Sequence, residues 1–359
     1  MKHMPRAKKK HLKNSRLARI VAECESSRSF RYKLSRESHS WFLKLYLGHY
    51  LNYPLAWFHE QMLAITEDPL LGLATVMAFR GAGKSTIMNL SLALWSILGK
   101  PQKKFIVIVS KSSQQAKIHL DNIRLELEQN KHLRNDFDIL QCKRIKQAGN
   151  SLEITQLDCK IIAISTTKSL RGLRHGSHRP DLIICDDLED SRYVLSKSTR
   201  ESTYQWFLHE VAPLGNTQTK IIVLGNLLHP DSFVMNLKQQ IETGKLNGIF
   251  RAYPLLDDNN KILWLEKFRS HQDIEQLKLT ISSELVWLSE YLLTFVSGIP
   301  ASMSELRAET STGLENNIKR ISTKKHINQK LIDMHGYKIS APIVMDTKWL
   351  FGEANKKID

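Results

Sequence analysis

A short glycine-containing segment has residue types and a spacing that suit phosphate binding. In FRGAGKST, residues 79–86, Lys84 and Ser85 follow Gly83 as in the pattern G-x-x-x-x-G-K-[ST]. Ala78 stands where that pattern has its first glycine. The plainer alternative is a glycine turn with a solvated lysine. We predict instead that ATP phosphates bind at Gly81, Ala82, Gly83, Lys84, Ser85 and Thr86, with Ser85 also ligating Mg²⁺.

A second segment with possible chemistry is acidic and lies further along the chain. In LIICDDLED, residues 182–190, an apolar run ends in carboxylates. Ligands of open α/β sheets bind at the carboxyl ends of strands. We expect Asp186 to hold Mg²⁺, and either Asp187 or Glu189 to orient or deprotonate the attacking water. A strand that merely ends in a polar turn is the minor alternative once the phosphate loop is considered.

Two further features lie beside these segments. Asn226 ends another apolar run, where it would sense the γ-phosphate, although an asparagine in an ordinary turn is the simpler interpretation. A basic loop precedes the acidic strand. It would supply an arginine to a neighbouring site or contact DNA phosphates, and a solvated positive loop is an equal alternative. Its charged or titratable residues are Arg171, Arg174, His175, His178 and Arg179.

The elements that must position these residues alternate between strands and helices. Apolar runs predict buried strands at 73–79, 104–110, 181–187 and 219–225. Helical spacing predicts helices at 84–98, 113–128 and 197–211, and residues 151–165 predict a hairpin. This alternation indicates an α/β fold, a P-loop NTPase with a mostly parallel sheet flanked by helices. A helical, basic N-terminal region precedes it.

Composition and charge favour a nucleic-acid partner. The 359 residues carry a net charge of +16, and about half of that excess lies before residue 20, where no acidic residue occurs. This arm is expected to be a solvated tail that can still contact phosphates. No apolar run is long enough to span a membrane, and the basic N-terminus lacks the apolar stretch of a signal peptide, so we expect a cytoplasmic protein. The four scattered cysteines predict neither zinc nor disulfides.

The ordered set of segments resembles the large terminase subunits of tailed phages, the ATPases that pump DNA into capsids. FRGAGKST is similar to the family's variant phosphate loop, in which the first glycine is often missing and an arginine precedes Gly-x-Gly-Lys-Ser. YPLAWFHEQM resembles its adenine-binding segment, LRGLRHGSHRPDLIICDDLED its acidic strand, and IIVLGNLLHPDS its coupling motif. ILWLEKFRS and SEYLL look like the segment that leads out of the ATPase domain. The resemblance covers residues from about 50 to 295.

The resemblance assigns further roles. It implies that Phe58 and Met62 contact adenine, and that Arg80 stabilises charge on the transferring phosphoryl group. Asn226 occupies a coupling position at which the family usually has threonine. Core packing is the plainer role for Phe58 and Trp57, and we assign the region of Trp264 and Trp287 to the core.

The family implies a nuclease domain after the ATPase domain, and this chain has little room for one. Only Asp346, in APIVMD, resembles a nuclease carboxylate, and thirteen residues follow it. We therefore predict a basic arm at 1–35, an ATPase domain at 36–255, and a linker with an incomplete C-terminal region at 256–359. We assign no DNA cleavage to this chain.

The leading hypothesis is an Mg-ATP-dependent motor subunit that translocates duplex DNA. The family implies a homo-oligomeric ring, a portal protein and a small terminase subunit as partners, the cytoplasm of a bacterial host, and no membrane. Two alternatives stay open. One is another nucleic-acid-dependent ATPase, such as a helicase-like enzyme. The other is a decayed prophage remnant that binds nucleotide or DNA without turnover.

Overall fold

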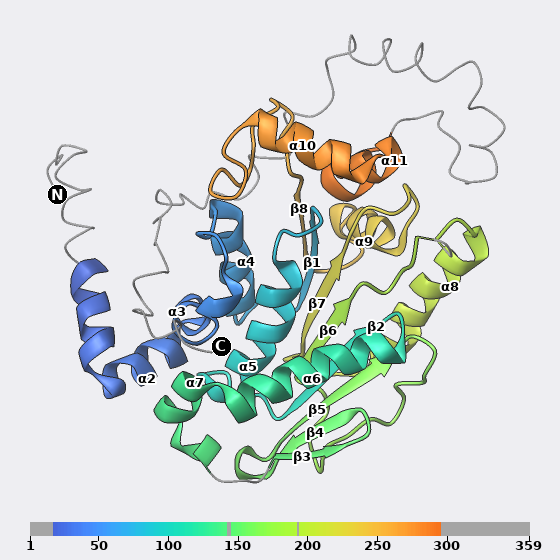
Figure 1. Ribbon diagram of the computed structural model, residues 1–359. Coiled ribbons are helices and arrows are strands. Elements are labelled where there is room, and N and C mark those ends of the chain that lie inside the picture. Colours follow the sequence, from blue (N-terminus) through green and yellow to red (C-terminus); the bar gives the residue numbers. More distant parts are fainter. Residues whose placement is uncertain (1–16, 142–144, 192–193, 296–359) are drawn as a thin grey trace, which may run out of the picture.

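The computed structural model describes residues 17–141, 145–191 and 194–295, and an eight-stranded sheet forms its centre (Figure 1). The strand order across the sheet is β3-β4-β5-β2-β6-β7-β1-β8. In chain order the strands are β1 (Leu73–Ala78), β2 (Phe105–Ser110), β3 (Ile145–Ala148), β4 (Ser151–Ile154), β5 (Cys159–Ser165), β6 (Leu182–Asp186), β7 (Lys220–Gly225) and β8 (Ile249–Tyr253).

The six strands from β5 to β8 in the spatial order of the sheet are parallel to one another. Only the pairs β3–β4 and β4–β5 are antiparallel. The predicted α/β class with a mostly parallel sheet is therefore confirmed, as are the four buried strands. The predicted hairpin is also present, as β4 and β5. The edge strands β3 and β8 were not predicted from the sequence.

Helices cover both faces of the sheet because the inner strands are apolar on both sides. Val76 and Ile108 enter one hydrophobic cluster, whereas their neighbours Met77 and Val107 enter a second cluster. Successive side chains of a strand point to opposite faces, so each strand supplies both clusters. A sheet that is buried in this way needs a layer of helices on each side.

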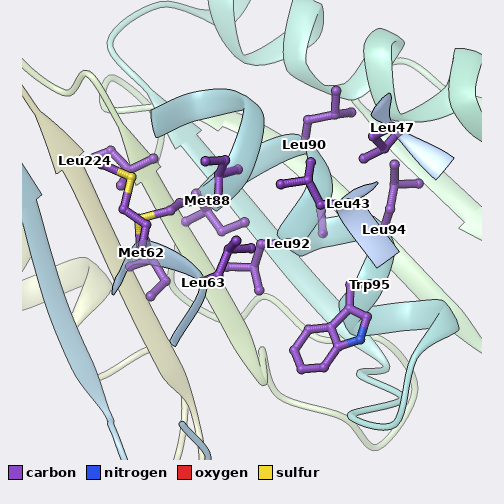
Figure 2. Packing of buried hydrophobic residues seen from close by; sticks show 14 of the residues in the cluster. Leu43, Leu47, Met62, Leu63, Met88, Leu90, Leu92, Leu94, Trp95 and Leu224 are labelled. Carbon is purple, nitrogen blue, oxygen red and sulfur yellow. The ribbon is translucent and has the colours of Figure 1, made fainter. Parts of the chain in front are cut away.

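The first cluster is covered by the larger group of helices. It includes side chains from α3 (His39–Tyr46), α4 (Trp57–Glu67), the π-helical turn η2 (Thr86–Ser91), α5 (Leu92–Leu98), α6 (Ser113–Gln129) and α7 (Lys131–Asp136). Helix α2 (Arg28–Glu37) packs outside them. Figure 2 shows part of this layer, where Met62 of α4, Met88 of η2 and Leu224 of β7 lie close together.

The second cluster is smaller and involves the helices that flank β7. Helix α8 (Lys197–Trp206) continues into the π-helical turn η5 (Phe207–Val211), and α9 (Phe233–Glu242) follows β7. Phe207 and Phe233 from these elements have ring centroids 5.1 Å apart and are fully buried in the second cluster.

The segment after β8 packs on the same core as the sheet. It contains α10 (His271–Ile281), α11 (Glu284–Val286) and the π-helical turn η6 (Trp287–Tyr291). Trp264 and Trp287 are buried in the first cluster together with Phe268 and Tyr291. Buried residues on both sides of position 255 thus share one cluster, and the domain boundary placed there stays a prediction.

Some of the predicted features fall on residues that the structure does not describe. The first sixteen residues of the basic arm, Cys142, and the segment from 296 to 359 with Asp346 lie outside them. Cys24, Cys159 and Cys185 are buried free thiols. Among the described residues, no helix is both long enough and apolar enough to cross a membrane.

Candidate active site

The glycine-rich segment forms a tight loop between a buried strand and a helix. Gly81 and Gly83 both adopt φ = +78°, a left-handed conformation that glycine adopts without strain. Ala78 lies earlier, inside β1, where it pairs with Tyr253 of β8. Because ordinary strand geometry suits any residue, the missing first glycine does not disturb the loop.

Two residues at the start of the helix point toward the ends of neighbouring strands. The ammonium Nζ of Lys84 donates a hydrogen bond to Oδ1 of Asn226 at 2.7 Å. The hydroxyl Oγ of Ser85 donates to Oδ1 of Asp186 at 3.3 Å. The structure thereby brings together four residues that sequence reasoning had selected from three separate segments. They meet because β7 lies between β1 and β6, and the three parallel strands end at the same edge.

The carboxylate of Asp186 is buried, and residues that sequence reasoning missed surround its second oxygen. Asn89 Nδ2 donates to Asp186 Oδ2 at 2.9 Å, and His119 Nε2 lies 3.7 Å from the same oxygen. Asn89 follows Ser85 by four residues, so both side chains leave one face of the helix. That spacing was a usable signal, whereas nothing in the sequence indicated His119 of α6.

Asp187 follows the strand in an unusual backbone conformation. Its φ is +50°, and its N–H donates to the carbonyl of Leu224 at 3.2 Å. Burial raises the pKa of Asp187, and the charge of Asp186 raises it further, while Lys84 acts in the opposite direction. The left-handed turn thus holds a carboxyl group with a raised pKa within the field of the phosphate-loop lysine.

Glu189, the other candidate base, is held by a helix. Its Oε1 accepts a hydrogen bond from the backbone N–H of Phe233, at the start of α9, at 2.9 Å. Burial raises the pKa of Glu189 to about 7, despite the opposing effect of that bond. Its side chain therefore ties the acidic segment to α9, which follows Asn226 in the chain.

Arg80 lies on the outer side of the loop, with 64% of its side chain exposed. Its Nη1 contacts Oε2 of Glu290, in η6, at 2.7 Å. The guanidinium is therefore engaged by the segment that follows β8.

A cavity of about 350 Å³ adjoins the phosphate loop. Besides residues 81–87, its lining is formed by Tyr50, Leu51, Asn52, Tyr53, Leu55, His59, Trp264 and Lys267. Phe58 and Met62 have no exposed surface and lie in the core, not in this lining. The aromatic side chains that border the cavity are Tyr50, Tyr53 and Trp264, which sequence reasoning did not select for binding. Trp264 is nevertheless almost buried, as expected of a core residue.

His59 connects the predicted adenine segment to the loop. It accepts a hydrogen bond at Nδ1 from the backbone N–H of Ala56, and its Nε2–H donates to the carbonyl of Ala82; both distances are 2.9 Å. Burial lowers the pKa of His59 to about 4, which keeps the ring neutral near pH 7. The neutral ring fixes the position of the loop without adding a charge to it.

The oxygen ligands at the end of β6 suit a magnesium ion that is shared with a substrate. Mg²⁺ is usually held by one or two protein oxygens together with substrate phosphates and water. Ser85 Oγ and Asp186 Oδ1 supply such oxygens side by side. In the part of the chain that the structure describes, no group of three or more His, Cys, Asp or Glu residues is placed to hold a metal. With Ser85 and Asp186 as ligands, phosphate and water oxygens would complete the coordination of such an ion.

The basic loop between β5 and β6 is tied to the protein by its own ion pairs. Arg171 Nε lies 2.8 Å from Oε1 of Glu210, and His175 Nε2 lies 3.2 Å from Oδ1 of Asp158. Arg174 and Arg179 are exposed. The loop thus presents exposed guanidinium groups at the surface.

Comparisons with known proteins gave matches among solved structures. No family model and no curated protein matches this chain. The ATPase domain of the Thermus phage P74-26 large terminase aligns with 13% identity and a TM-score of 0.46, covering 73% of this chain and 99% of that domain. A mutant of that domain aligns with 12% identity and a TM-score of 0.47, covering 73% and 100%.

Proposed function

We propose that this chain is an Mg²⁺-dependent ATPase that translocates duplex DNA, and that it is the ATPase part of a phage large terminase subunit. One observation carries the proposal. Lys84 and Ser85 of a glycine-rich loop lie within hydrogen-bond distance of Asn226 and Asp186 at the ends of two parallel strands. A loop of this kind binds phosphates, and the carboxylate beside it suits the accompanying metal ion.

The residues divide the work of hydrolysis. The loop backbone and Lys84 would bind and orient the phosphates, because a helix start offers free N–H groups and a favourable dipole. Ser85 and Asp186 would hold Mg²⁺, which neutralises phosphate charge. Asp187 is the base in this proposal. The charge of Lys84 affects the pKa of Asp187. In Glu189, by contrast, one carboxylate oxygen already accepts a hydrogen bond from the backbone N–H of Phe233 in α9.

The state of the nucleotide would reach the rest of the protein through Asn226. Lys84 Nζ donates to Asn226 Oδ1, and a bound phosphate would compete for the same ammonium group. Asn226 directly follows β7, and α9 begins shortly after it. A change at the phosphates is therefore passed to α9 by the release of one hydrogen bond.

DNA would be held through its backbone. A net charge of +16 favours phosphate contacts, which hold a duplex without reading its sequence. The exposed arginines of the basic loop and the N-terminal arm are the candidate contacts. A ring of copies, a portal protein and a small terminase subunit are further parts of the proposal and rest on the family resemblance.

Steady-state ATP hydrolysis with Mg²⁺, with and without long duplex DNA, tests the proposal. We expect turnover that rises with DNA. Lys84→Ala should abolish it, by roughly a hundredfold or more, because a phosphate-stabilising charge is lost. Binding of the duplex should survive this substitution, since the DNA contacts are separate.

Three other outcomes contradict parts of the proposal. Loss of DNA binding in Lys84→Ala argues against separate sites for nucleotide and DNA. Separation of duplex strands during hydrolysis favours a helicase-like enzyme. Folded wild-type protein without any turnover favours a remnant that only binds.

A further inference from the structure

Asn89 is a fully buried amide in the helix that follows the phosphate loop. It lies in the π-helical turn η2, between the buried apolar residues Met88 and Leu90. Its Nδ2 donates to Oδ2 of Asp186 at 2.9 Å, whereas its Oδ1 has no hydrogen-bond partner among the described residues. A buried amide that is only partly satisfied costs stability. The hydrogen bond to Asp186 is therefore what this side chain contributes at its position.

Two side chains fix the carboxylate of Asp186, one at each oxygen. Ser85 Oγ donates to Oδ1 at 3.3 Å, and the shorter bond from Asn89 reaches Oδ2. His119 Nε2 lies 3.7 Å from Oδ2, which is too far for a hydrogen bond. Because each oxygen has its own donor, rotation of the carboxylate would break both bonds. The pair of bonds thus keeps Oδ1 beside Ser85.

The bond from Asn89 is compatible with a metal ion at the site. The oxygens proposed for Mg²⁺ are those of Ser85 and Oδ1 of Asp186, which lie side by side. Asn89 uses the other oxygen, Oδ2, so it does not compete with the ion for a ligand. Carboxylates that bind metals are commonly oriented by such hydrogen bonds from residues that do not touch the metal.

We infer that Asn89 is a positioning residue for the metal ion of the proposed ATPase; this inference rests on the function proposed above. It holds Oδ2 of Asp186 so that Oδ1 stays where metal and phosphates meet. Asn89 acts only through Asp186 and touches neither nucleotide nor metal. Loss of its amide leaves the phosphate loop able to bind a nucleotide, but it lowers the affinity that Mg²⁺ adds.

Nucleotide binding to the full-length protein with and without metal tests this role. A non-hydrolysable ATP analogue is titrated in EDTA and in Mg²⁺, and the ratio of the two dissociation constants gives the gain due to the metal. Asn89→Leu, which keeps a similar volume, should lower this gain roughly tenfold or more, as is typical when a metal ligand loses its supporting hydrogen bond. Affinity in EDTA should stay at the wild-type value, since the loop is unchanged.

Thr75→Val is the matched control. Thr75 is buried in β1, and its hydroxyl also has no hydrogen-bond partner in the described part of the chain. It lies between Leu73 and Met77, on the sheet face of the second cluster, whereas Asp186 lies on the other face. This substitution should keep the wild-type gain from Mg²⁺.

A double-mutant cycle decides whether Asn89 acts through Asp186. In an Asp186→Asn background, Asn89→Leu should cause no further loss of the Mg²⁺ gain. A loss that persists there overturns the inference. An equal loss of affinity in EDTA and in Mg²⁺ also overturns it, because a packing defect would have that effect. Melting temperatures check that the variants fold, and Asn89→Ala gives the same comparison if leucine is not accommodated.

The same titrations separate the two proposals. A wild-type protein that binds no nucleotide, or gains nothing from Mg²⁺, overturns the proposed function, and the role of Asn89 falls with it. A wild-type gain that is undiminished in Asn89→Leu overturns the role of Asn89 alone.

Discussion

Four charged side chains of the candidate site have a protein partner that a ligand must replace or keep. Lys84 is engaged by Asn226, and Arg80 by Glu290. Asp186 accepts from two side chains, whereas Glu189 accepts from a helix backbone. The cations are thus held by single bonds that phosphates can replace, while the carboxylates are fixed more firmly. This asymmetry suits a site that binds an anion and keeps its metal ligand in place.

Substitution of the two candidate bases, Asp187 and Glu189, should have different effects on kcat. Asp187→Asn should lower kcat by roughly a hundredfold, since general bases contribute effects of about that size. Glu189→Gln should keep kcat within a few-fold, because its oxygen can still accept from the Phe233 N–H. Single-turnover hydrolysis with saturating Mg-ATP measures both. The reverse ranking would make Glu189 the base.

Glu189 should also give stability a pH dependence. Its ordinary pKa is 4.5, and burial raises it to about 7 in the folded protein. Between these values the folded chain binds the proton more tightly than the unfolded chain, so stability from this group falls as pH rises from 4.5 to 7. The melting temperature of Glu189→Gln minus that of the wild type should therefore be more positive at pH 8 than at pH 4.5. A constant difference across this range would contradict the shift.

Among the structural elements, the buried apolar strands were predictable from the sequence, and the edge strands of the sheet were not. Strands β1, β2, β6 and β7 are continuous apolar runs, which predict buried strands. Strand β8 has two exposed residues among five, and β3 is mostly exposed, so neither has a core pattern. Each forms through pairing with a neighbouring strand, and single-sequence periodicity does not record that pairing.

The same limit applies within the candidate site. Residues inside the loop and acidic motifs could be selected because their spacing reflects local chemistry. Glu290, His119 and Lys267 come from distant segments, and only the fold brings them near. The family resemblance assigned Phe58 to adenine, with core packing as the alternative, because an aromatic on an amphipathic helix can face either core or ligand. Its complete burial depends on packing against the sheet, which the sequence does not specify.

Helix α4 depends on a lysine from the sheet. Lys220 Nζ, at the start of β7, donates to the carbonyls of Ile65, Thr66 and Asp68, where the helix ends. Lys220→Met should lower the free energy of unfolding by about 1–3 kcal/mol, because these carbonyls lose their donor. Urea denaturation measures the change. Lys245→Met, on an exposed turn, is the matched control; a similar loss there would show a general charge effect.

For the molecule as a whole, positive charge is distributed unevenly along the chain and is concentrated at its N-terminal end. About half of the positive excess precedes residue 20, and most of it lies in residues 1–16, ahead of the helix at residues 17–26. Nucleic-acid affinity and ATP hydrolysis are therefore expected to be separable by removing that segment.

Deletion of residues 1–16 tests this separation. Each lost phosphate contact lowers the slope of log K against log salt by roughly 0.9 for duplex DNA. We expect the deletion variant to bind duplex DNA more weakly and with a shallower slope, while ATP hydrolysis without DNA is unchanged. Titrations at several salt concentrations measure the slope. An identical slope would exclude the arm from DNA contact.

The hairpin of β3 and β4 has a practical consequence. It lies at one edge of the sheet, separated from β6 by the strands β5 and β2, and a Cβ atom added to Gly149 at its turn would meet nothing within 4 Å. A short peptide tag, or a dye-bearing cysteine at a turn position other than Gly149, whose φ of +58° favours glycine, would not displace any residue around the cavity. Individual molecules could be tethered to a surface through this turn, and the proposed pulling on DNA could then be tested as a force, with the phosphate-loop edge left free.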